Sequence, residues 1–178
     1  NIYNQSLLAS LIHHQGEEKA KEWARGVVEN MARSPAGGDT DQIRAVAAGE
    51  CRVGVGNHSS YVRLLKSDKI ADRKTARRVG IIFPNQDGRG AHTNIGGAGV
   101  VADAPNAEEA RQFLEFLASD KAQGIFASGN NEFPVVDNAL ADPVLESWGN
   151  FRMDDVNVSV LGRNNPRAVR IFDEVGWR

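Results

Sequence analysis

The chain has 178 residues, 41% hydrophobic and 25% charged, with a formal net charge of −2 at pH 7. This length suits one ordinary domain or two small lobes, and the composition is typical of a globular protein. The near-neutral net charge gives no electrostatic basis for binding nucleic acid. No apolar run is long enough to cross a bilayer. The single cysteine, Cys51, excludes an internal disulfide.

The first part of the chain is expected to be helical. Residues 1–14 carry four aliphatic side chains on one helical face, and Gly16 interrupts the pattern. A second helix is expected over 17–33, and a third runs from a cap at Asp39 to Gly49. The aliphatic residues expected to face the core in the first helix are Leu7, Leu8, Leu11 and Ile12.

Residues 52–65 indicate a short buried strand, a turn at Gly56-Asn57 and a helix. In open α/β sheets, ligands bind at this end of a strand, where a helix N-terminus offers N–H groups and partial positive charge. We therefore expect a binding site here, with His58, Ser59 and Ser60 able to offer imidazole and hydroxyl groups to a metal or an anion. The ordinary alternative is a plain strand–turn–helix in which the serines only cap the helix.

The rest of the chain alternates apolar runs with helical patterns. Two further strands are expected over 79–84 and 94–101, separated by a turn-rich loop. Further helices are expected over 68–78, 107–119, 120–128, 142–148 and 165–175, and the helix over 107–119 is expected to face inward with Ala110, Phe113, Leu114 and Leu117. Three strands form a thin sheet for this much helix, so either strands have been missed or part of the fold is absent.

Sequence motifs do not indicate an enzyme. The glycine-rich segment 96–99 lacks the Lys-Ser/Thr ending of a phosphate loop, and Ser59 has no nucleophile elbow around it. No dinucleotide fingerprint and no H-E-x-x-H motif occur. We therefore expect a binding function without catalysis.

Six segments, in one order along the chain, resemble the periplasmic ferric-iron-binding proteins of bacterial ABC importers, in their cyanobacterial-type branch. The segments are 1–6 (Asn-Ile-Tyr-Asn-Gln-Ser), 41–42 with 45–50, 53–57, 90–100, 131–135 and 164–177. The resemblance implies an α/β fold of the type II periplasmic-binding-protein kind, with one lobe and part of the other. It also implies that the chain is the C-terminal portion of a periplasmic protein whose signal peptide and remaining lobe precede Asn1, and that an ABC importer permease is its partner.

The resemblance further implies a division into lobes. Residues 1–84 are expected to form most of the C-terminal lobe, 85–135 to return to the N-terminal lobe, and 136–178 to pack back on the first. Without the N-terminal lobe, apolar surface along 94–101 is expected to be exposed, so that a second chain or a dimer could complete the sheet.

The family binds Fe(III) in an interlobe cleft through tyrosine phenolates, in some cases with a synergistic anion, because a hard trivalent ion favours anionic oxygen donors. The resemblance implies that Tyr3 is one ligand. The family's Asn-x-Tyr-Tyr pair falls on Ser59 and Ser60, and serine is a poor replacement because its hydroxyl is far less acidic. Tyr61 and His58 are candidate substitutes. Tyr61 follows the pair by one residue, and a step of one residue turns a helical side chain by about 100°, which directs Tyr61 away from the position of the pair.

Three interpretations follow. The chain is an iron-binding homologue with weakened binding, a binding protein for another anion or organic acid held by Asn57, Ser59, Ser60 and Arg63, or a fragment without autonomous function. Visible absorbance of an iron–phenolate complex would favour the first, and stabilisation by anions without iron would favour the second.

Overall fold

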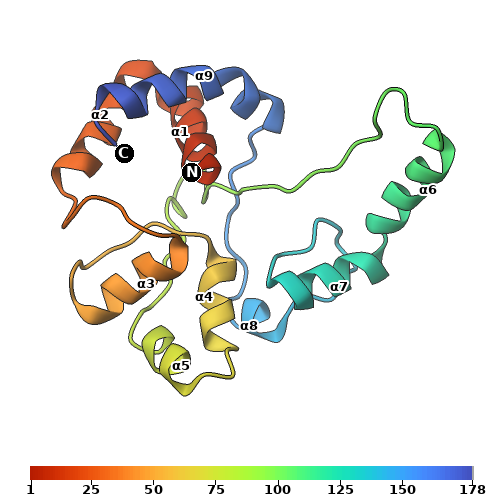
Figure 1. The fold of residues 1–178 in the computed structure, drawn as a ribbon, viewed down its shortest axis with the longest axis horizontal. Coiled ribbons are helices and arrows are strands. Elements are labelled where there is room, and N and C mark those ends of the chain that lie inside the picture. Colours follow the sequence, from red (N-terminus) through yellow and green to blue (C-terminus); the bar gives the residue numbers. More distant parts are fainter. Residues whose placement is uncertain (178) are drawn as a thin grey trace. The chain divides into compact units, whose positions relative to one another are not determined.

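The protein is described by a computed structural model that covers residues 1–177, and within this range it consists of nine helices (Figure 1). Its contacts fall into two compact units. The first comprises Asn1–Ala36, Ile82–Ile95 and the described residues from Phe151 onward; the second comprises Gly37–Ile81 and Gly96–Asn150. The helices are α1 (Ile2–Gln15), α2 (Glu17–Glu29), α3 (Asp39–Ala48), α4 (His58–Leu65), α5 (Ile70–Ala76), α6 (Ala107–Leu117), α7 (Asp120–Asn130), α8 (Pro143–Glu146) and α9 (Val158–Glu174).

These two units differ from the expected division at 1–84, 85–135 and 136–178. Each unit consists of segments that pack together, whereas the expected boundaries concern the lobes of a whole family member. The assignment of segments to lobes therefore stays a prediction.

In the first unit, α1, α2 and α9 lie together around one apolar core (Figure 1). Helix α1 contributes Leu8, Leu11 and Ile12, which are buried as the sequence predicts, while Leu7 is only half-buried. Alanines on the facing helices allow the backbones to lie close, and three aromatic side chains pack against the core. The alanines are Ala20, Ala24 and Ala168, and the aromatic residues are Trp23, Phe172 and Trp177.

Helix α9 begins seven residues earlier than the expected start at residue 165, so that expectation was wrong. Asn157 caps the helix by accepting a hydrogen bond from the Ser159 N–H at 3.0 Å. Pro166 therefore lies inside the helix, on the same face as Gly162 one turn earlier, instead of opening it. A strong local cap with an apolar face outweighs the preference of proline for the first helical position.

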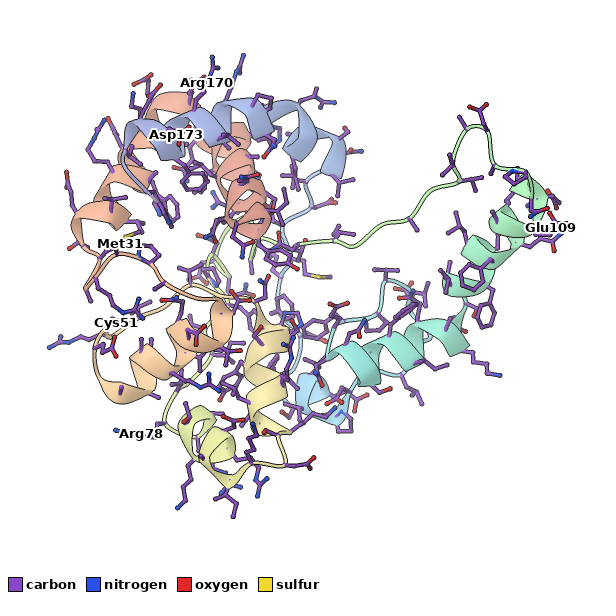
Figure 2. The ribbon with its side chains drawn as sticks, in the orientation of Figure 1. Met31, Cys51, Arg78, Glu109, Arg170 and Asp173 are labelled. Atoms are coloured by element: carbon purple, nitrogen blue, oxygen red, sulfur yellow. The ribbon has the colours of Figure 1, made fainter. Side chains whose placement is uncertain are left out.

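In the second unit, α3, α4 and α5 form one group and α6 contacts α7 (Figure 1). Val62 and Leu64 of α4 and Ala76 of α5 are buried. Helix α6 buries none of its residues, and the side chain of Phe113 is 58% exposed, so the expected inward face of this helix is not formed. Figure 2 shows Glu109 projecting from α6, and this side chain too is exposed. The amphipathic pattern of α6 is present, but the surface that it would cover is not supplied by the described residues.

The three expected strands are absent from residues 1–177, where the only ladder contact is a parallel bridge between Ala91 and Met153. Segments 52–56 and 79–84 carry side chains that should have been buried in a sheet. Val53 is 75% exposed and Ile82 84% exposed, and residues 94–101 are largely exposed. A strand requires a hydrogen-bonded neighbour, and no described segment provides one. The expected exposure of 94–101 is nonetheless confirmed.

Exposed apolar segments of this kind promote association between chains. We expect the chain to self-associate in a concentration-dependent way through residues 94–101, as seen by size-exclusion chromatography with light scattering. Val100→Ser with Val101→Ser should weaken association at least about tenfold, since each buried valine contributes ~1.5 kcal/mol or more. Val135→Ser, an exposed valine outside this segment, is the matched control. A monodisperse 19.3 kDa species at every concentration would contradict this expectation.

Candidate functional site

Tyr3 lies in the first turn of α1, in the first unit, and its side chain is 47% exposed. The Asn1 side chain fixes the start of the helix by accepting the Tyr3 N–H at 3.1 Å, and the Ser6 hydroxyl donates to the Tyr3 carbonyl at 3.0 Å. The phenolic hydroxyl makes no hydrogen bond to any residue in the described range. The backbone of Tyr3 is therefore held while its phenol stays accessible.

Ser59 and Ser60 lie in the first turn of α4, in the second unit. Ser60 is buried, and its hydroxyl donates to Asp39 Oδ2 at 3.3 Å. The same oxygen accepts the Asn57 backbone N–H at 3.2 Å and the Asn57 side-chain amide at 2.8 Å. One carboxylate at the start of α3 thus satisfies the residues that open α4. Ser59 is half-buried.

Asp39 is the residue that the sequence analysis missed. Its position at a helix start was recognised, but the partner of its carboxylate lies 18 to 21 residues further along the chain. A local cap pattern carries no signal for this long-range contact. Because of this contact, the backbone N–H of Asn57, which was expected to be open for an anion, already donates to the Asp39 carboxylate.

His58 opens α4 and packs among aromatic rings. Its ring centroid lies 5.0 Å from that of Phe133 and 6.1 Å from that of Trp148. Burial lowers the pKa of His58 below its usual value, and a hydrogen bond to the Asn131 backbone opposes the shift. His58 Nε2 is enclosed without a hydrogen-bond partner within the described residues. The neutral imidazole is therefore held in an apolar environment, which suits packing better than the capture of a hydrated ion.

Tyr61 is half-buried, and its hydroxyl donates to the Val79 carbonyl at 2.8 Å. Burial raises the pKa of the Tyr61 phenol. Both features favour the protonated form, because a phenolate could not donate to the carbonyl. The geometry thus ties Tyr61 to segment 79–84 and does not favour it as an iron ligand.

Arg63 is exposed on α4, and the structure gives it no ion pair among residues 1–177. The structure places Asn57, His58, Ser59, Ser60, Tyr61 and Arg63 on or beside one short helix of the second unit. Tyr3 belongs to the other unit. Among residues 1–177, no group of three or more His, Cys, Asp and Glu side chains could hold a metal ion.

Known proteins resemble this chain in sequence and in structure. The profile of a family described as bacterial extracellular solute-binding protein matches residues 1–156. Iron uptake protein A2 of Synechocystis sp. is 48% identical over 100% of this chain and 52% of its own length. The solved Trichodesmium protein IdiA (FutA), in complex with iron and citrate ligands, has a TM-score of 0.97 and 52% identity, covering 100% of this chain and 56% of its own. The ferric binding protein from Campylobacter jejuni has a TM-score of 0.93 and 41% identity, covering 99% and 56%.

The chain therefore spans about half the length of the relatives that it matches. The solved relatives share its fold, which confirms the expected α/β fold class of type II periplasmic binding proteins with only part of the two lobes. The three strands predicted from the sequence are nevertheless absent from the described residues of this chain. In the described range, no helix is both long and apolar enough to cross a membrane.

Proposed function

The chain belongs to the bacterial extracellular solute-binding protein family, and on this premise we propose that it is part of a periplasmic protein that binds Fe(III) for an ABC importer. The observation that carries the proposal is the similarity over the whole chain to iron uptake protein A2 and to an IdiA (FutA) structure in complex with iron and citrate. The bound iron is cargo, accompanied by a synergistic anion, and the protein acts without catalysis beside an importer permease.

Tyr3 is the residue that we propose as an iron ligand in this chain. Its phenol is accessible, has no internal hydrogen-bond partner in the described range, and is fixed in position by the Asn1 cap of α1. A phenolate is an anionic oxygen donor of the kind that a hard trivalent ion prefers. Tyr3 therefore combines the chemistry that Fe(III) needs with a rigid backbone.

Iron binding by this chain is weakened at Ser59 and Ser60. A serine hydroxyl does not ionise near neutral pH, and the Ser60 hydroxyl already donates to Asp39. Tyr61 and His58 do not restore the missing donors, because the first donates to Val79 and the second packs among aromatic rings. Tyr3 remains as the tyrosine with a free hydroxyl.

One alternative keeps the same fold with another ligand. Arg63 is an exposed cation without an ion-pair partner in the described residues, and it lies on α4, the helix that also carries Ser59. An organic acid bound there would be held by the positive charge of Arg63 and would not need a phenolate ligand. Stabilisation of the chain by organic acids in the absence of iron, lost in Arg63→Gln, would favour this alternative.

The experiment that tests iron binding measures metal retained per chain. The protein is loaded with Fe(III)-citrate, excess is removed by gel filtration, and iron is quantified in wild type and in Tyr3→Phe. We expect the wild type to retain iron, and Tyr3→Phe to retain at most about a tenth as much under the same wash, equivalent to ~1.4 kcal/mol of binding free energy. The phenylalanine keeps the ring and removes only the oxygen. Equal retention by the two proteins would exclude Tyr3 as a ligand.

A further inference from the structure

The turn over residues 85–90 is rigidly built in the first unit. The Asn85 carbonyl accepts hydrogen bonds from the N–H groups of Gly88 at 3.0 Å and Gly90 at 2.9 Å. Asn85 and Gly90 both have positive φ, at 60° and 94°. A Cβ on Gly90 would lie 2.6 Å from the Arg152 carbonyl oxygen, so this glycine is required by close backbone approach.

The turn is also fastened to the segment that precedes Asp154. Gln86 donates its side-chain amide to the Arg152 carbonyl at 3.1 Å and accepts the Arg152 N–H at 2.7 Å. The Arg152 guanidinium donates to the Gly88 carbonyl at 2.7 Å. These hydrogen bonds fix the shape of the six-residue turn before any ligand binds.

An open hollow of about 570 Å³ lies against this turn. Its walls are the turn residues 85–89 together with His14 and Gln15 at the end of α1. All of these residues belong to the same unit. His14 is oriented by hydrogen bonds from its Nε2 to the buried carboxylate of Asp154, at 2.9 and 3.0 Å.

Arg89 is the unusual member of this wall. It makes no hydrogen bond or ion pair with any residue in the part of the chain that the structure describes, and its Nε is enclosed without an acceptor. The buried carboxylate of this unit, Asp154, accepts from Ser10 and His14 instead. The Nε is closed off from solvent, so an acceptor from outside the chain would meet the terminal nitrogens of this half-buried guanidinium.

We propose that this hollow binds a small oxyanion, a carboxylate or phosphate group held by the guanidinium of Arg89. The planar fork of arginine matches two oxygens of such a group, and His14 and Gln15 also line the hollow. Asp87 is the acidic residue of the wall. It is exposed to solvent, so its charge is screened and it weakens the attraction between the Arg89 guanidinium and an anion without cancelling it. The residues of this site include neither Tyr3 nor any residue of α4.

Thermal unfolding without iron tests the site, using inorganic phosphate and acetate as probes and chloride at equal ionic strength as the reference. We expect one or both probes to raise the Tm of the wild type, by roughly 5–10 °C at a hundredfold excess over Kd. A response to phosphate alone or to acetate alone identifies the oxyanion that the hollow prefers. Because no iron is present, failure of the iron-binding proposal leaves this result unaffected.

Three variants make the test specific. Arg89→Gln should abolish the Tm shift, while Arg25→Gln, which removes an exposed arginine of α2 in the same unit, should leave it unchanged. Asp87→Asn should lower the Kd by removing the one negative charge of the wall. If Arg89→Gln does not fold, Arg89→Lys takes its place. Phosphate and acetate are then titrated into the wild type and Arg89→Lys by calorimetry, and weaker binding is expected for the lysine variant. Absence of any shift in the wild type, or an equal shift in Arg89→Gln, would overturn the proposal.

Discussion

Replacing Ser59 and Ser60 together by tyrosine is expected to increase ferric iron retention at least about tenfold, or ~1.4 kcal/mol of binding free energy. The change supplies two phenol oxygens where the chain now has hydroxyls that do not ionise. Ser60 is buried and donates to Asp39, so Ser60→Tyr would remove that bond, whereas half-buried Ser59 can be enlarged more easily. Ser59→Tyr alone should therefore recover part of the gain with less loss of stability.

The matched control is Ser59→Phe with Ser60→Phe, which adds the same rings without oxygen. The binding gain should appear only in the tyrosine pair, measured by iron retained per chain at equal protein concentration. If the phenylalanine pair retains as much iron as the tyrosine pair, the effect comes from packing and not from coordination. If the tyrosine pair retains no more than wild type, the serine positions do not lie at the iron site.

Leu8→Ala is expected to destabilise the first unit by about 2–5 kcal/mol in free energy of unfolding. Leu8 is fully buried in the core formed by α1, α2 and α9, and its removal leaves a cavity among helices whose backbones are already close. Denaturant unfolding followed by tryptophan fluorescence reports mainly this unit, because two of the three tryptophans of the chain, Trp23 and Trp177, flank the same core.

Leu140→Ala makes the identical substitution at a leucine that is 81% exposed in the second unit. Its cost should be within about 0.5 kcal/mol, as is usual for surface positions. Similar costs for the two variants would show that α1 is not packed as the structure describes. In that case the rigid placement of Tyr3 would also lose its basis.

The helices could be predicted from the sequence because their signals are local. The aliphatic face of α1, the start of α3 at Asp39 and the end at Gly49 depend on residues within one or two turns of each other. Helix α9 was placed too late because proline at residue 166 was given more weight than the Asn157 cap.

The strands could not be predicted correctly because a strand is defined by a partner. Segments 52–56, 79–84 and 94–101 have strand-like composition, yet the described residues supply no neighbouring strand for them. For 52–56 and 79–84, apolar composition alone therefore indicated burial that the described residues do not provide.

The candidate site was predicted in part. The sequence predicted a helix that begins at Asn57 or His58, and α4 begins at His58 after Asn57; the binding roles of these residues stay a prediction. The roles of His58 and Tyr61 depend on Phe133 and Val79, which are far away in sequence, as does the contact of Asp39 with Ser60. Such pairings follow from the folded chain and have no local signature.

The visible absorption spectrum of the iron-loaded protein tests the central claim most directly. A phenolate bound to Fe(III) gives a charge-transfer band that neither serine, carboxylate nor imidazole ligands produce. We predict such a band in the wild type after Fe(III)-citrate loading and gel filtration, and its loss in Tyr3→Phe. Iron retained without the band, or a band that persists unchanged in Tyr3→Phe, would contradict iron binding through Tyr3.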